Sequence, residues 1–455
     1  MRWLDRVLPV RMTRVALVAP SGSLRDLLLA VARAGTVEID SVQPAAGESA
    51  GVVAALSVAA PDLEELAGAG RADLIAGENQ LRQYAEGAVR ENRTGALAGW
   101  MPAGQVAPLG AALADIGCAV VPLRWPAGAD PPTLTAGSAG QRALTPLVSA
   151  YGTVPYRDVN PAWLAWSTYA LMFGMMFGDV GDGLLLIAAS VAMAAGWPRL
   201  AGRDRGAWPF VAGAGAAAVL FGFAYGEFFG PSGVLPVLWL DPISSPVRLM
   251  VAGLAFGVVL LAGAYLLGLI NRWQEGGLAA ALYSPSGLAG AALFAAIGAT
   301  AAGVYFHLPP LAIGGLTAAA AALGLAFSGF LVTAGGGGYG VMQASVEVFD
   351  LVVRLGSNVA SFARLAAFGL AHAALGLLVW EGTRALWHRG GLLAVLAIVL
   401  LVAGSALAFA LEGLVAAVQA LRLEYYELFS RVFVTQGRAF RPWRLRIDDG
   451  SVRHE

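Results

Sequence analysis

Lysine is absent from this chain of 455 residues, whose 29 basic residues other than histidine are all arginine. Because P-loop enzymes bind ATP phosphates through a lysine, the chain is not expected to hydrolyse ATP by itself. Cysteine occurs once, at Cys118, which excludes disulfide frameworks, cysteine-based zinc sites and cysteine-ligated clusters. We therefore expect no catalytic site of its own, no cofactor and no metal site.

Charged residues are also scarce, at 13% of the chain, against about 25% in soluble domains. They are unevenly distributed: residues 1–150 hold 26 of the 59, and the 270 residues from 151 to 420 hold 21. A segment this long and this poor in charge must be solvated by lipid, which excludes a purely soluble enzyme. The net charge of −1 gives no electrostatic basis for binding nucleic acid.

Residues 1–150 are typical of a small cytoplasmic α/β domain. The expected elements are strands at Val15–Ala19, Val37–Ile39 and Cys118–Leu123 and helices at Leu24–Ala34 and Gly104–Gly117. Gly35 is a plausible C-cap for the first helix, and the polar stretch 61–93 predicts a short helical arm. The first residues lack the apolar segment of a signal peptide, so none is expected.

Residues 151–443 are predicted to form a mainly α membrane domain. Its eight hydrophobic spans lie at about 162–178, 182–197, 208–229, 247–270, 287–305, 309–332, 345–382 and 392–432. The last two exceed the roughly 20 residues that cross a bilayer, so we expect them to be long and tilted. An even number of spans puts both termini on one side, and the arginines favour the cytoplasm. Residues 444–455 are then a cytoplasmic tail, and a bacterial plasma membrane is the expected location.

Polar residues form a stripe along the seventh span. Steps of three, four or eight place them on one helical face, and such a face must contact protein or water rather than acyl chains. The stripe comprises Glu347, Asp350, Arg354, Ser357, Asn358, Ser361, Arg364 and His372. The eighth span carries a second stripe of Ser405, Glu412, Gln419 and Arg422. Each of the last two helices thus presents a polar surface that includes an arginine deep in the membrane.

Arg364 is the most informative residue of the stripe. An unpaired arginine at the bilayer centre costs about 2.5–3.5 kcal/mol on insertion scales, and a guanidinium cannot lose its proton to avoid that cost. One interpretation is a structural ion pair with Glu412 or Asp350. The other is a fixed positive charge that repels protons and attracts a carboxylate on a partner, forcing it to ionise.

The depth of the neighbouring groups favours the second interpretation. At 1.5 Å per residue, His372 lies about 12 Å to one side of Arg364 and Asp350 about 21 Å to the other. On the antiparallel eighth span, Glu412 lies about 15 Å to one side of Arg422, and further acids lie on the other. Protonatable groups flank a cationic centre without passing through it, which predicts two offset half-channels for protons.

Three acidic residues lie near the ends of the first three spans. Asp179 and Asp182 are expected to cap the second helix. Glu227 fits either a packing hydrogen bond or a water path, and the sequence does not decide between them.

Within the seventh span, residues 357–375 (SNVASFARLAAFGLAHAAL) resemble the signature helix of subunit a, or subunit I, of V-type and A-type rotary ATPases. Further stretches agree in the same order: 151–161 (YGTVPYRDVNP), 173–181 (FGMMFGDVG), 225–230 (YGEFFG), 411–430 (LEGLVAAVQALRLEYYELFS) and 437–442 (GRAFRP). The resemblance covers about 151–443. In that family the cytoplasmic domain is usually about twice as long as here.

The resemblance implies a stator beside a rotating proteolipid ring, without a catalytic site, in a complex with the peripheral and central stalk subunits of a proton-transporting ATPase. The implied translocation residues are Arg364 and Arg422 at the ring, His372 and Glu412 in the extracytoplasmic half-channel, and Asp350 in the cytoplasmic path. Glu424 stands where the family often has a histidine, which implies a differently tuned cytoplasmic path.

Two other classes of function stay open at this point. A self-contained secondary transporter requires internal repeats and broken helices, and no repeat relates the first four spans to the last four. A non-translocating assembly scaffold or paralogue would fit the shortened arm. The sequence does not distinguish H⁺ from Na⁺ as the ion.

Overall fold

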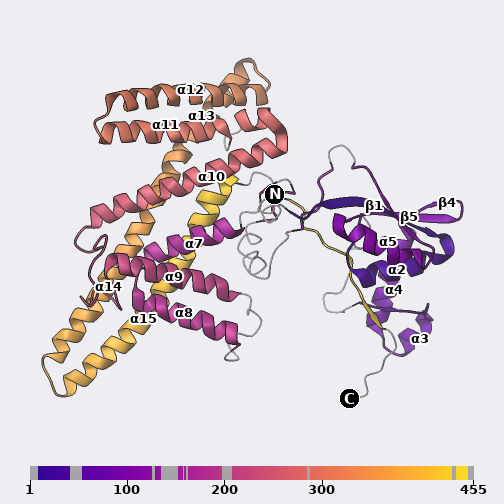
Figure 1. Cartoon of the computed structure of the whole chain (residues 1–455), viewed down its shortest axis with the longest axis horizontal. Coiled ribbons are helices and arrows are strands. Elements are labelled where there is room, and N and C mark those ends of the chain that lie inside the picture. Colours follow the sequence, from indigo (N-terminus) through magenta and orange to yellow (C-terminus); the bar gives the residue numbers. More distant parts are fainter. Residues whose placement is uncertain are drawn as a thin grey trace. The chain divides into compact units, whose positions relative to one another are not determined.

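The computed structural model describes residues 9–40, 54–125, 129–134, 152–156, 158–159, 162–196, 207–283, 287–432 and 437–448 (Figure 1). The chain divides into two compact units. The sheet unit comprises residues 1–136, 153–156 and 437–455, and the helical unit comprises residues 137–152 and 157–436. Tyr151, Arg157, Asn160 and Pro161 of the expected 151–161 motif, and residues 449–455 of the expected tail, lie outside the described residues.

The sheet unit is built on an antiparallel sheet with the strand order β2-β5-β1-β6, and β4 pairs with β5. The strands are β1 (Met12–Pro20), β2 (Glu38–Ile39), β4 (Val89–Glu91), β5 (Thr94–Pro102) and β6 (Ala119–Pro122). In β1, Val15, Leu17 and Ala19 are buried at every second position, as one core-facing side of a strand requires. The three predicted strands are present, whereas the long strand β5 was not predicted.

The described residues of the sheet unit also form four α-helices. They are α2 (Leu24–Ala34), α3 (Leu63–Gly68), α4 (Ala72–Glu86) and α5 (Val106–Ala114). The predicted C-cap is confirmed, since Gly35 is left-handed with φ 56° and its N–H donates to the carbonyl of Val31. Two hydrogen bonds of 2.6 and 2.7 Å join the Arg25 guanidinium of α2 to the Glu78 carboxylate of α4. The arm expected over 61–93 is therefore a pair of short helices tied to the domain.

The described end of the chain belongs to this sheet unit. Strand β7 (Arg446–Asp448) pairs in parallel with β3 (Ala55–Ser57), and Trp443 is buried with the core residues of the sheet. The ring of Trp443 lies 4.7 Å from that of Tyr84 on α4. The residues predicted as a tail thus complete the packing of the N-terminal residues.

The helical unit consists of a series of apolar helices. They are α7 (Ala162–Met176), α8 (Val180–Ala195), α9 (Trp208–Tyr225), α10 (Pro246–Tyr283), α11 (Leu288–Tyr305), α12 (Pro309–Thr333), α13 (Gly337–Ser361), α14 (Ala363–Trp387), α15 (Leu392–Leu423) and the short α16 (Ser430–Val432). Helices α11 and α12 pack side by side, as do α8 with α9 and α14 with α15 (Figure 1).

Six segments of the described residues are long and apolar enough to cross a membrane. Two of them, 337–387 and 392–432, are 51 and 41 residues long, so the expectation that the last two spans are the long ones is confirmed. Helices α7 and α8 have 15 and 16 residues, short of the roughly 20 that a bilayer requires. The count of eight spans is therefore confirmed for six, and the first two remain predictions.

Two spans differ from their predicted form in ways that affect the site. The third span ends at Tyr225, because Gly226 adopts a left-handed conformation with φ 76°. Glu227 therefore lies in the loop after α9 rather than in a helix. The seventh span is interrupted at Phe362, between α13 and α14. Arg364 is thus the second residue of a new helix instead of the middle of a continuous one.

Candidate functional site

Arg364 lies at the start of α14 and donates three hydrogen bonds within the helical unit. Its Nε bonds the carbonyl of Ser361 at 3.0 Å, Nη1 bonds Oε1 of Gln419 at 3.4 Å, and Nη2 bonds Oε1 of Glu427 at 3.3 Å. The predicted intramolecular partners, Glu412 and Asp350, are wrong. Glu412 is hydrogen-bonded to His372, and Asp350 forms an ion pair with Arg354. The carboxylate that pairs with Arg364 is that of Glu427.

The pair with Glu427 leaves Arg364 incompletely satisfied. A guanidinium has five N–H donors, and three are used here. The side chain of Arg364 keeps 26% of its surface exposed, against 10% for Glu427. An additional carboxylate can therefore approach the guanidinium without displacing its internal partners.

A second arginine is tied to the same carboxylate through Asn358. With its amide oriented to suit its neighbours, Asn358 donates to Oε2 of Glu427 at 2.8 Å and accepts from Nη2 of Arg431 at 2.5 Å. Arg431 is buried and lies 5.6 Å from the ring centre of Tyr265 on α10. We call Arg364, Gln419, Glu427, Asn358 and Arg431 the Arg364 cluster.

A π-helical segment, Glu424–Phe429, positions Glu427 at the end of α15. Its i→i+5 hydrogen bonds put more residues in each turn than an α-helix has, so residues three apart are rotated further from one another. Glu424 accordingly faces α7, where it accepts a hydrogen bond of 2.8 Å from the Thr168 hydroxyl, while Glu427 faces Arg364. The two buried glutamates therefore bind different helices: Glu424 accepts a hydrogen bond from α7 and Glu427 accepts one from α14.

Four residues predicted for the translocation path are not members of this cluster. Arg422, Glu347 and Ser357 are exposed, and neither Arg422 nor Glu347 forms an ion pair with a described residue of the cluster. Asp350 pairs with Arg354 at 2.6 Å, one helical turn along α13. These side chains line the outside of the helical unit rather than its interior.

His372 and Glu412 meet across α14 and α15. Nδ1 of His372 hydrogen-bonds Oε2 of Glu412, and the imidazole also packs against the ring of Phe177, with ring centres 4.8 Å apart. His372 is 7% exposed. The remaining polar atoms of this pair, Nε2 of His372 and Oε1 of Glu412, have no hydrogen-bond partner among the described residues.

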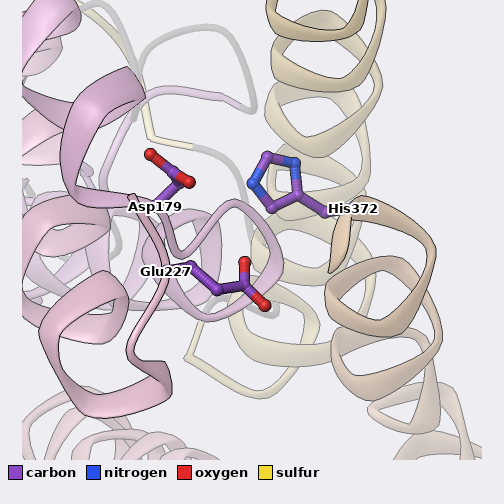
Figure 2. A group of neighbouring side chains, drawn as sticks. All are labelled: Asp179, Glu227 and His372. Atoms are coloured by element: carbon purple, nitrogen blue, oxygen red, sulfur yellow. The ribbon is translucent and has the colours of Figure 1, made fainter. Parts of the chain in front are cut away.

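Two further carboxylates face His372 from the other side. Asp179 and Glu227 are 0% and 3% exposed, and one ligand atom from each of them and from His372 all lie within 4.8 Å of one another (Figure 2). Asp179 caps α8, as predicted, by accepting from the N–H of Asp182. We call His372, Glu412, Asp179 and Glu227 the His372 cluster.

Two adjoining cavities reach the His372 cluster. A narrow one of about 20 Å³ is lined by residues that include Asp182, Ser405, His372 and Glu412, which is room for about one water molecule. A wider one of about 500 Å³ shares Asp182 and Ser405 with it and extends between α8, α14 and α15. The polar cluster is therefore accessible from a larger space in the helical unit.

The sequence contained signals for the residues that the prediction missed. Glu427 follows Gln419 by eight residues, the same step that separates Arg364 from His372 on their helix. Asp179 and Glu227 lie in the quoted stretches 173–181 and 225–230. Nothing in their spacing, however, connects either acid with His372, and no metal-binding group was expected.

Parts of the chain are similar in sequence to known proteins. The model of the V-type ATPase 116 kDa subunit family matches residues 89–232. The A-type ATP synthase subunit I of Pyrococcus horikoshii is 27% identical over 68% of this chain and 47% of its own length, and that of Archaeoglobus fulgidus is 26% identical over 69% and 53%. The vacuolar proton translocating ATPase 100 kDa subunit of Dictyostelium discoideum is 40% identical over 16% of this chain and 9% of its own length.

The apolar helices indicate an integral membrane protein, and these matches support a subunit of a rotary ATPase. The chain is thus similar to subunit a, or subunit I, of the V-type and A-type ATPases. It spans about half the length of the curated relatives it matches. The A-type relatives are archaeal, so the expected bacterial origin is not supported.

Proposed function

We propose that this chain is the stator subunit of the membrane sector, that it forms two proton half-channels against a proteolipid ring, and that it couples ion flow to ATP turnover on partner subunits. The observation that carries the proposal is that the Arg364 guanidinium is only partly paired and partly exposed. Its charge is permanent, yet two of its donors remain unused and a quarter of its side chain is exposed. Such a group suits a carboxylate that arrives from a neighbouring subunit.

The separation of the two clusters supports the half-channels. His372 follows Arg364 by eight residues of α14, or about 12 Å along the helix. Apolar residues including Leu365, Ala366 and Gly369 are buried between them. A proton entering beside His372 has no protein carboxylate on this stretch of α14 by which to pass Arg364. It therefore has to transfer to the ring and travel with it.

The Arg364 cluster provides the electrostatic barrier. Two guanidiniums, Arg364 and Arg431, lie near a single carboxylate, Glu427, so the cluster keeps a positive charge that repels protons. A ring carboxylate facing it is favoured in the ionised form. The energy available from the membrane is about 2.3 kcal/mol per charge for each 100 mV.

Co-purification tests the assembly. A tagged chain, extracted from its native membrane in mild detergent, is expected to retain a proteolipid ring and the soluble ATPase subunits, identified by mass spectrometry. Ion transport by the purified chain alone in liposomes would instead establish a self-contained transporter. A chain that carries stalk subunits but no ring would establish a scaffold.

The Glu412→Gln variant tests the half-channel beside His372. The amide keeps the size of the side chain but cannot carry a proton, and loss of a positioned proton-transfer group typically lowers a rate by roughly a hundredfold. We expect ATP-driven proton uptake by reconstituted vesicles to fall accordingly, while the assembled complex persists. Glu381→Gln, at an exposed acid of α14, is the control and is expected to pump normally. Equal pumping by the two variants would exclude Glu412 from the path.

A further inference from the structure

We propose that the His372 cluster is a binding site for a divalent cation of the zinc type. An imidazole nitrogen of His372 and one carboxylate oxygen each from Asp179 and Glu227 lie within 4.8 Å of one another (Figure 2). Imidazole and carboxylate are the ligands that zinc takes in proteins that lack cysteine ligands. The only cysteine of the chain, Cys118, belongs to the sheet unit.

The orientation of His372 points to a cation rather than to a packing role. Its Nδ1 is held by Glu412, whereas its buried Nε2 has no partner among the described residues. Figure 2 shows the nitrogen at the far side of the ring directed toward Asp179 and Glu227. A carboxylate on one ring nitrogen and a free lone pair on the other is the arrangement that orients histidine for a metal.

Both carboxylates retain the capacity to bind an ion. Asp179 accepts from the N–H groups of Asp182, Phe229 and Gly230 at 2.7–3.0 Å, which uses three of about four lone-pair positions on a carboxylate. The position of Asp179 is thereby fixed, and one lone pair is left. The Glu227 carboxylate forms no hydrogen bond with a described residue, although Glu227 is 3% exposed.

Charge and distance also favour occupation. Three carboxylates, those of Asp179, Glu227 and Glu412, surround one imidazole in a buried space, and buried charges require a counter-charge or a metal. Zinc–ligand bonds of 2.0–2.2 Å place neighbouring ligand atoms about 3.4 Å apart. The three atoms must therefore approach by at most about 1.4 Å, which side-chain rotation can supply. The two adjoining cavities provide the way in.

The consequence for transport rests on the proposed function, whereas the binding does not. A cation held by His372 and Glu227 would occupy the space beside Glu412 and exclude protons from it. Zn²⁺ that is added on the side of the membrane where the 500 Å³ cavity opens is therefore expected to inhibit ATP-driven proton uptake.

Binding is measured on the purified, assembled complex with Co²⁺, whose visible absorption reports its ligands, and with Zn²⁺ as competitor. We expect one site per chain. Glu227→Gln and His372→Gln should each abolish the absorption band, and Glu412→Gln should weaken binding by about 10–100-fold, as loss of a group that orients a metal-binding histidine does. Glu381→Gln and His388→Gln, which alter exposed residues of α14 or its end, are the matched controls.

The proposal is overturned if the wild-type complex binds no Zn²⁺, or if Glu227→Gln and His372→Gln bind as tightly as their controls. If Zn²⁺ binds at the cluster but leaves proton uptake unchanged, the metal site stands and the proposed proton path is wrong. If Zn²⁺ inhibits uptake equally in wild type and in Glu227→Gln, the inhibitory site lies elsewhere and the inference fails.

Discussion

Arg364→Ala is expected to abolish ATP-driven proton uptake by reconstituted vesicles while the complex still assembles. The substitution removes the permanent positive charge that we expect to ionise the ring carboxylate and to block a direct leak. It also removes a group that only Ser361, Gln419 and Glu427 contact through hydrogen bonds among the described residues. The measurement is the quenching of a pH-sensitive dye, with ATP hydrolysis recorded in parallel.

Arg384→Ala is the matched control for this experiment. Arg384 lies in the last turn of the same helix, where its guanidinium is 5.1 Å from the ring centre of Trp380, and it is distant from both clusters. We expect it to pump at the wild-type rate. Wild-type pumping by Arg364→Ala would contradict the mechanism, because no other guanidinium of the Arg364 cluster has a comparable exposed surface: Arg431 is buried.

Glu427→Leu is expected to produce the second large effect. Arg364 and the Asn358–Arg431 pair both depend on this carboxylate. Removing one partner of a buried ion pair costs about 3–5 kcal/mol, and the partial exposure of Arg364 reduces this to about half. We expect a lower unfolding temperature of the membrane sector. We also expect proton uptake to fall by roughly tenfold or more, because Arg364 loses the carboxylate that positions it.

Glu427→Gln separates the two contributions. Its amide oxygen can still accept from Arg364, whereas its NH2 group then faces the donor of Asn358, so we expect a smaller loss of stability than in Glu427→Leu. The substitution removes one negative charge from the cluster. We therefore expect Arg364 to be held less firmly and the pH dependence of proton uptake to change. If both Glu427 variants unfold and pump like Glu381→Gln, the carboxylate does not position Arg364.

Local patterns accounted for much of the fold. The apolar period of Leu24–Ala34 and the position of Gly35 sufficed to place α2 and its cap. Strand β5 escaped prediction because Thr94–Pro102 is rich in small residues such as Ala96, Ala98 and Gly99, which gives a weak apolar signal. The parallel pairing of β3 with β7 joins residues almost 400 positions apart, and no local pattern encodes it.

The site was predictable only in part for a related reason. The family resemblance implied that His372 and Glu412 share one half-channel, and the structure joins them by a hydrogen bond. The prediction from helical steps assumed an uninterrupted seventh span, whereas the helix is interrupted at Phe362. It also assumed α-helical rotation at the end of the eighth, where a π-helical segment separates Glu424 from Glu427. Asp179, Glu227 and His372 come from three separate segments of the chain. Their proximity depends on tertiary packing, which the sequence pattern does not encode.

Two glycines set how far Glu227 stands from His372. Gly230, with φ 91°, meets Gly376 of α14, and a Cβ atom on Gly376 would lie 2.9 Å from the Cα of Gly230. The loop that carries Glu227 therefore rests directly on the backbone of the helix that carries His372, with no side chain between them. The spacing of the acids around the imidazole can thus be adjusted by a methyl group at a position that takes no part in the chemistry. A natural or engineered substitution at Gly376 would therefore change the distances within the His372 cluster without replacing any of its residues.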